Sequence, residues 1–147
     1  MSAETIDSRT TAIVSEFREL SDWKARYRRI IEAGKALPEL AEERREDRYR
    51  VKGCQSQVWL IPAFEGGRVR FEAWSDAAIV RGLIALLLRV YDDQPPEAIL
   101  TTPPTFVDEL GLSEHLSQSR ANGLASMIRQ VQLYATVYRA MDQREGA

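Results

Sequence analysis

The sequence is poor in cysteine and histidine: it has one of each, Cys54 and His115. A lone cysteine excludes an intramolecular disulfide. A zinc site built from Cys and His, or an all-cysteine iron–sulfur site, would need about four such ligands. We therefore expect no resident metal and no cofactor. Cys54 is either an inert packing residue or a reactive thiol, and composition does not separate the two.

The sequence also lacks a long hydrophobic run and an excess of charge of one sign. Its first thirty residues contain no apolar signal segment. The most apolar stretch, 77–91, is about 15 residues long, too short to span a bilayer core, and Arg81 and Arg89 interrupt it. With 20 basic and 22 acidic residues, the sequence pI is near 5.5. We expect a cytoplasmic protein that binds neither membranes nor nucleic acid.

Apolar spacing and turn residues predict helical ends around an extended middle. The expected helices cover 7–20, a stretch from the N-cap Ser21 to Gly34, 76–91 with Ser75 as N-cap, 105–110, and 119–142 with Ser119 as N-cap. The expected strands cover 49–52, 57–65 and 69–73. This predicts an α+β fold in two layers, with a three-stranded antiparallel sheet packed against several helices. We expect one domain over 1–147, with its core at about 21–142.

A two-residue turn at Gly66–Gly67 fixes the expected pairing of the last two strands. With those glycines as the loop, Trp59 faces Trp74 and Gln57 faces Asp76. The antiparallel return therefore brings Asp76 to the end of the sheet that carries Cys54.

Cys54 is expected in a short polar loop, next to the N-terminus of the 76–91 helix. Such an end stabilises a nearby anion by roughly 0.3–1 kcal/mol, which favours the thiolate. The carboxylate of Asp76 opposes this, and Arg120 would favour the thiolate if the fold brought it close. The sequence therefore leaves the direction of the pKa shift of Cys54 open.

Three interpretations of Cys54 compete. Free cysteines often only fill space in a core, but the polar loop around Cys54 favours a reactive thiol. A hydrolase pair of Cys54 with His115 is conceivable, although a cap or surface role is more typical of such a histidine. Ser56 lacks the Gly-x-Ser-x-Gly setting of a serine hydrolase, and no phosphate-binding glycine motif is present.

Several segments together resemble the SufE family, which includes SufE and CsdE. The segment Val51-Lys52-Gly53-Cys54-Gln55-Ser56-Gln57-Val58-Trp59 is similar to that family's active loop. The segments 75–85, 115–124 with 127–129, and 27–38 are similar to further signatures in the same order. The resemblance covers about 23–140.

The resemblance implies a sulfur carrier. Such proteins accept persulfide sulfur from a pyridoxal-phosphate cysteine desulfurase of the SufS or CsdA type, stimulate it, and pass the sulfur to iron–sulfur scaffold proteins. Cys54 matches the acceptor, and Gly53, Gln55, Ser56, Asp76 and Arg120 match positions for loop positioning or partner docking.

The implied fold is similar to that of IscU-type scaffolds. Those need three cysteines, so this chain fits sulfur delivery and not cluster building. The chain would not be an independent enzyme, and a homodimer is allowed. A non-catalytic module that regulates a desulfurase is a further alternative.

Overall fold

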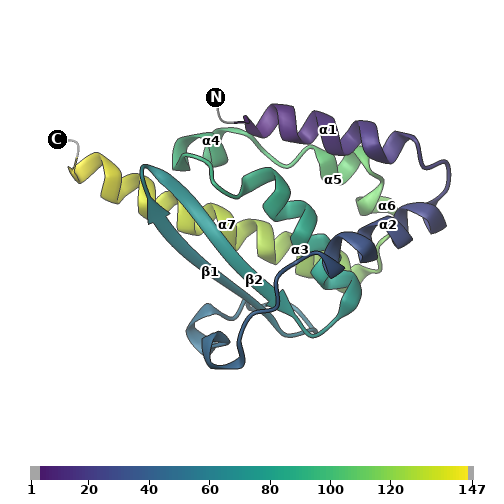
Figure 1. The fold of residues 1–147 in the computed structure, drawn as a ribbon, viewed down its shortest axis with the longest axis horizontal. Helices are drawn as coiled ribbons and strands as arrows, with labels where there is room; N and C mark the ends of the chain where they lie inside the picture. Colours follow the sequence, from purple (N-terminus) through teal and green to yellow (C-terminus); the bar gives the residue numbers. More distant parts are fainter. Residues whose placement is uncertain (1–3, 146–147) are drawn as a thin grey trace.

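Seven α-helices, two short 3-10 helices and one β-hairpin make up residues 4–145, the part of the chain that the computed structural model describes (Figure 1). The elements in chain order are α1 (Ile6–Arg18), α2 (Trp23–Lys35), η1 (Glu42–Arg44), η2 (Asp47–Tyr49), β1 (Val58–Glu65), β2 (Arg68–Ser75), α3 (Ala78–Tyr91), α4 (Pro96–Thr101), α5 (Phe106–Glu109), α6 (Leu112–His115) and α7 (Gln118–Glu145). Residues 1–3 and 146–147 of the expected domain lie outside the described residues. Among those described, no helix combines the length and apolarity needed to cross a membrane.

The hairpin has the register that the sequence predicts. Trp59 pairs with Trp74, and the antiparallel ladder ends in the pair Glu65 and Arg68. Gly66 and Gly67 have φ angles of 58° and 76°, as a two-residue turn of this twist requires. The glycine turn therefore sets which residues of β2 lie beside the loop that precedes β1.

The prediction of a third strand over 49–52 is wrong. The described residues form a two-stranded sheet, and only one isolated bridge, between Arg50 and Trp59, joins β1 to the preceding segment. Pairing stops because Tyr49 ends a 3-10 helix on one side of this bridge and Gly53, with a φ of 91°, turns the chain on the other. The fold is α+β with a two-stranded antiparallel sheet.

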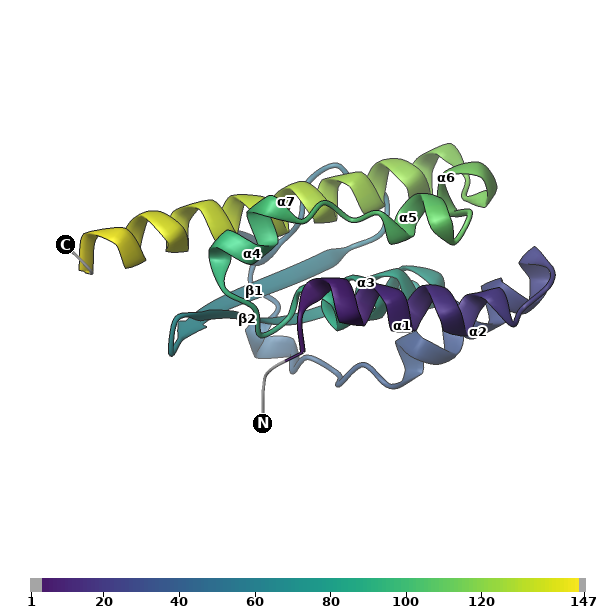
Figure 2. The same cartoon turned by 90° about the horizontal axis from the view of Figure 1, so that it is seen from above.

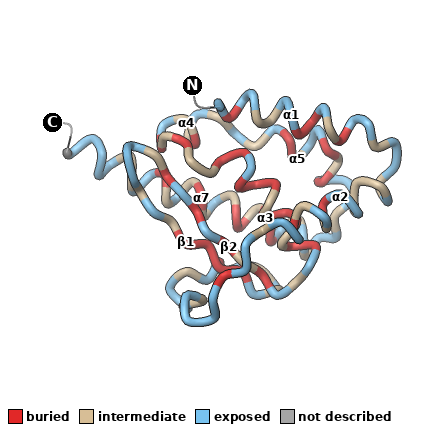
Figure 3. The backbone as a smooth tube through the Cα atoms, in the orientation of Figure 1, coloured by how far each residue is buried: buried red, intermediate tan, exposed pale blue. Residues whose placement is uncertain are grey.

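The hairpin lies between two apolar layers. One face packs on the main core, to which α3 and α7 contribute (Figures 1 and 2). The other face carries a small cluster of Leu40, Trp59 and Ile61, flanked by Trp74. The Arg45 guanidinium lies 5.9 Å and 5.7 Å from the two tryptophan rings. Burial on both faces explains why the first half of β1 is continuously buried (Figure 3).

Three helix starts differ from the predictions: α2 and α7 are capped by a neighbouring side chain, and α3 has no side-chain cap at its N-cap residue, Ala77. Asp22, not Ser21, is the N-cap of α2. α3 begins at Ala78, and Ser75 is the last residue of β2. The Ser75 hydroxyl accepts the N–H of Ala77 at 3.2 Å. α7 begins at Gln118, and the Ser117 hydroxyl, not that of Ser119, accepts the N–H of Arg120 at 3.3 Å.

Helices α2 and α3 pack at a distance that only glycine permits. A Cβ atom added at Gly82 would lie 2.1 Å from the Ile30 carbonyl oxygen, and one at Gly34 would lie 2.6 Å from the Gly82 nitrogen. Both contacts are with backbone atoms, which cannot move aside as a side chain can. These two glycines therefore fix the position of α3 against α2.

Replacing Gly82 with alanine should destabilise the protein. Overpacking in a rigid contact costs about 1–3 kcal/mol or more, so the free energy of unfolding should fall by at least this amount in urea titrations. Gly123→Ala is the matched control, because its Cβ would make only an ordinary 3.5 Å contact with the Cys54 sulfur. Alanine in that helix should be neutral or stabilise by about 0.5–1 kcal/mol. Equal losses in the two variants would contradict the close packing.

Candidate functional site

Hydrogen bonds between backbone groups, together with one to the Asp76 carboxylate, close the base of the Cys54 loop. The N–H of Val51 donates to the Val58 carbonyl at 2.8 Å. The N–H of Gln57 donates to Asp76 Oδ1 at 3.0 Å, and the N–H of Asp76 donates back to the Gln57 carbonyl at 3.4 Å. The predicted encounter of Gln57 with Asp76 is thus confirmed. The six residues between Val51 and Val58 form the loop that carries Cys54.

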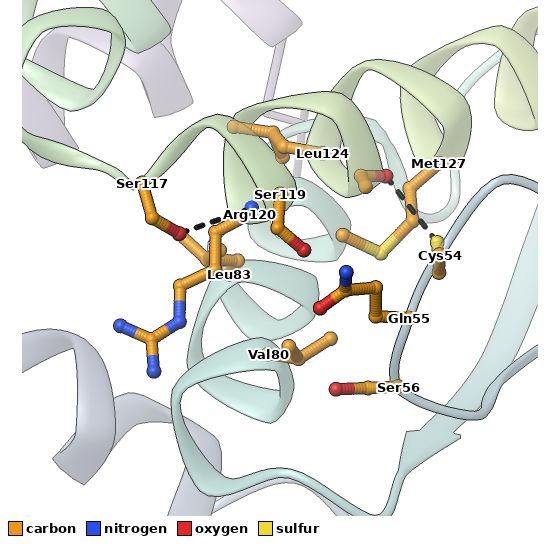
Figure 4. Close-up of a pocket in the computed structure, with 11 residues that line it drawn as sticks. Cys54, Gln55, Ser56, Val80, Leu83, Ser117, Ser119, Arg120, Leu124 and Met127 are labelled. Carbon is orange, nitrogen blue, oxygen red and sulfur yellow. Dashed lines mark hydrogen bonds between the residues drawn. The ribbon is translucent and has the colours of Figure 1, made fainter.

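The loop rests on the first turns of α7. The Cys54 thiol is half-buried, and its Sγ lies 3.6 Å from the Gly123 carbonyl oxygen, to which it donates (Figure 4). Gly53 lies so close to α7 that a Cβ atom there would be 2.6 Å from Ser126 Oγ. The positive φ of Gly53 favours glycine, and a side chain there would also have to displace the Ser126 hydroxyl. The residue before Cys54 is therefore fixed by the backbone.

A cavity of about 380 Å³ opens beside the thiol. The residues that line it come from the Cys54 loop, α3, and α7 with the residue before it: Cys54, Gln55, Ser56, Val80, Leu83, Ser117, Ser119, Arg120, Gly123, Leu124 and Met127. Its lining combines apolar side chains with hydroxyl, amide and guanidinium groups. A second cavity on the other side of the loop is lined by 50–54 together with Asp47, so Cys54 borders both.

Burial raises the pKa of the Cys54 thiol, which settles the direction that the sequence left open. The thiol contacts α7 through the Gly123 carbonyl oxygen, which is a hydrogen-bond acceptor. Figure 4 shows the Arg120 guanidinium pointing away from Cys54, and it lies 3.5 Å from the Tyr27 hydroxyl. Cys54 at rest is therefore a neutral thiol at pH 7.

The predicted site residues around Cys54 differ in whether they line the cavity beside the thiol. Gln55, Ser56 and Arg120 line the same cavity as Cys54. Asp76 is exposed and does not line it, but its carboxylate closes the loop at Gln57.

His115 does not join this site. Its ring stacks on Trp23 with centroids 4.7 Å apart, and it lines neither cavity that Cys54 borders. The geometry therefore does not place His115 beside Cys54 as the base of a Cys–His hydrolase pair. Within residues 4–145 no cluster of three His, Cys, Asp or Glu side chains could hold a metal ion.

The chain is similar to proteins of a known family. The family described as "SufE: Fe-S metabolism associated domain" matches residues 11–135. The chain belongs to the SufE family. This membership associates it with iron–sulfur metabolism.

Two curated relatives are uncharacterized SufE-like proteins of rhizobia. The Rhizobium etli protein is 45% identical over 130 residues, which cover 85% of this chain and 88% of that protein. The Rhizobium meliloti protein is 43% identical over 124 residues, covering 81% and 89%. The solution structure of a hypothetical protein from Thermus thermophilus is similar, with a TM-score of 0.72 and 25% identity, covering 87% of this chain and 93% of that one.

The raised pKa of Cys54 predicts slow alkylation at neutral pH. Because iodoacetamide reacts with the thiolate, the rate should rise with pH through an inflection above that of an ordinary cysteine. The rate can be followed by intact-protein mass spectrometry across the pH range. In denaturant, where burial is lost, the inflection should return to the ordinary value. A native inflection at or below the ordinary value would contradict the half-buried neutral thiol.

Loss of the Asp76 carboxylate should loosen the loop of this SufE-family chain. Asp76→Ala removes the acceptor of the Gln57 N–H, and a net loss of about 1 kcal/mol would raise the alkylation rate of Cys54 about fivefold at constant pH. Asp76→Asn is the matched control, because its amide oxygen can still accept that bond. Equal rates in the wild type and Asp76→Ala would show that Asp76 does not restrain the loop.

Proposed function

We propose that this chain is a sulfur carrier that accepts sulfur as a persulfide on Cys54. The donor is a pyridoxal-phosphate cysteine desulfurase, and the sulfur goes on to iron–sulfur cluster assembly. The observation that carries the proposal is the position of Cys54, the one cysteine of a SufE-family chain, on a loop at the mouth of a cavity. In this proposal the chain stimulates the desulfurase and acts in the cytoplasm.

The transfer step is a thiol exchange. Cys54 first loses its proton to water, and its thiolate attacks the outer sulfur of the persulfide on the desulfurase cysteine. A bond forms between Cys54 Sγ and that sulfur, while the bond to the desulfurase cysteine breaks and that cysteine leaves as a thiolate. One sulfur–sulfur bond replaces another, so no oxidant or reductant is needed. Delivery repeats the step, with a thiolate of the receiving protein as the nucleophile.

The resting position of Cys54 suits a carrier that reacts only with its partner. Desolvation and the contact with Gly123 keep the thiol protonated and partly shielded from small oxidants. The loop is held by the backbone bond from Val51 to Val58, the closure at Asp76, and the contacts of Gly53 and Cys54 with α7. Displacing this short segment would present the thiolate to a desulfurase without unfolding the core.

The neighbouring residues have supporting roles in this proposal. Gly53 supplies the turn that aims Cys54 at α7, and Asp76 positions the loop. Gln55 and Ser56 line the cavity beside the thiol, where they can donate hydrogen bonds to a persulfide. Arg120 is exposed at the far side of that cavity and is suited to docking a carboxylate of a partner protein.

Sulfur acceptance is tested by incubating the chain with a desulfurase and free cysteine. Intact-protein mass spectrometry without reductant should show one added sulfur atom on the wild type and none on Cys54→Ser. The serine side chain is nearly isosteric, so Cys54→Ser should retain the fold, checked by circular dichroism. Absence of a mass gain on the wild type with an active desulfurase would refute the proposal.

A relocated thiol is the matched control. The double variant Cys54→Ser with Ser21→Cys has one exposed cysteine away from the cavity. It should gain little sulfur, because position 21 is outside the loop that presents the acceptor. Equal loading of this variant would mean that any exposed thiol is sulfurated, and stimulation of the desulfurase by Cys54→Ser alone would favour a purely regulatory module.

A further inference from the structure

Exposed basic residues lie on both sides of the Cys54 loop. Arg50 and Lys52 line one of the two cavities that the thiol borders, and Arg120 lines the other. All three of these residues are exposed. Figure 4 shows the Arg120 guanidinium at the far side of its cavity, directed away from the thiol. Positive charge therefore flanks the loop and faces solvent.

A fourth basic residue, Arg129, approaches the loop from α7. Its guanidinium donates to Ser126 Oγ at 3.0 Å. That oxygen is in contact with the loop, because a Cβ atom built on Gly53 would lie 2.6 Å from it. The bond to Ser126 therefore holds the guanidinium next to the loop, while Arg129 itself stays exposed.

None of these four side chains forms an ion pair within residues 4–145. The ion pairs of the described residues use other arginines, such as Arg44, which pairs with Glu72. The side-chain partners of Arg120 and Arg129 are hydroxyl groups, which carry no charge. The positive charges around the loop are therefore not neutralised by carboxylates of the described chain.

Two carboxylates also lie at the loop. Asp47 lines the same cavity as Arg50 and Lys52, and the Asp76 carboxylate accepts the N–H of Gln57. Four positive charges thus stand against two negative ones. The whole chain has a formal net charge of -2, so this excess of positive charge is local to the loop and is not a property of the composition.

We propose that Arg50, Lys52, Arg120 and Arg129 form a basic docking surface for a partner protein whose own reactive sulfur is surrounded by carboxylates. The inference rests on the proposed function, in which that partner is the sulfur donor. Because the four charges are spread over both sides of the loop, they match an acidic protein surface better than one small anion. They attract and orient that surface over Cys54, which speeds the encounter by about tenfold or more at low ionic strength.

The charge around the thiol is tested with two alkylating reagents that differ in charge. Iodoacetate is an anion and iodoacetamide is neutral, and both react with the same Cys54 thiolate. The ratio of their rates therefore does not depend on the pKa of the thiol or on loop opening. Lys52→Glu with Arg129→Glu should lower the ratio of the iodoacetate rate to the iodoacetamide rate about tenfold at about 0.01 M salt. The difference should vanish at about 1 M salt.

Lys35→Glu with Arg18→Glu is the matched control. It makes the same change in net charge at exposed positions that line neither cavity of Cys54, so its ratio should stay close to the wild-type value. The neutral variant Lys52→Gln with Arg129→Gln should lower the ratio about threefold. Equal ratios in the charge-reversed loop variant and the control would overturn the proposal.

Docking is tested by sulfur loading with a desulfurase and free cysteine at varied concentrations of the chain. Lys52→Glu with Arg129→Glu should need about tenfold more chain for half-maximal loading, and added salt should raise the wild-type value toward that of the variant. Normal loading of the wild type with no change in the variant would overturn the docking proposal and leave the carrier function standing. A wild type that gains no sulfur from an active desulfurase would refute the carrier function, and the docking proposal with it.

Discussion

The close contact of the Cys54 loop with α7 is the constraint on which the site depends. Gly53 lies against the Ser126 hydroxyl with a positive φ, which disfavours a larger residue at this position, and the Cys54 thiol reaches the Gly123 carbonyl. This contact sets both the partial burial of Cys54 and the raised pKa that follows from it. The hairpin carries the loop on one side of this contact, and α7 forms the other side.

Neither His115 nor Arg120 is placed to activate the Cys54 thiol. The His115 ring stacks on Trp23, and the Arg120 guanidinium points away from Cys54. A hydrolase would need such groups already in place. A sulfur carrier needs only access, a leaving group on its partner and a loop that can move. The surroundings of Cys54 therefore suit the sulfur transfer that we propose.

Local patterns predicted the hairpin and the loop, but not what the loop packs against. Gly66 and Gly67 determine the register, and the register brings Asp76 to Gln57. The prediction of a third strand was wrong because the backbone turn at Gly53 ends the pairing with β1. The alternation of apolar and polar residues does not reveal such a turn. The partnership of Cys54 with Gly123 joins residues 69 positions apart. It depends on how α7 packs, which helix periodicity alone does not determine.

Direct transfer from protein to protein is the central claim, and a single-turnover experiment tests it most directly. A desulfurase is loaded with 35S from labelled cysteine, freed of substrate, and mixed with this chain in the presence of excess unlabelled sulfide. The account predicts that the label passes to the peptide containing Cys54 and is released by a thiol reductant. Label that stays on the desulfurase, or that is diluted by the unlabelled sulfide before it reaches Cys54, would contradict it.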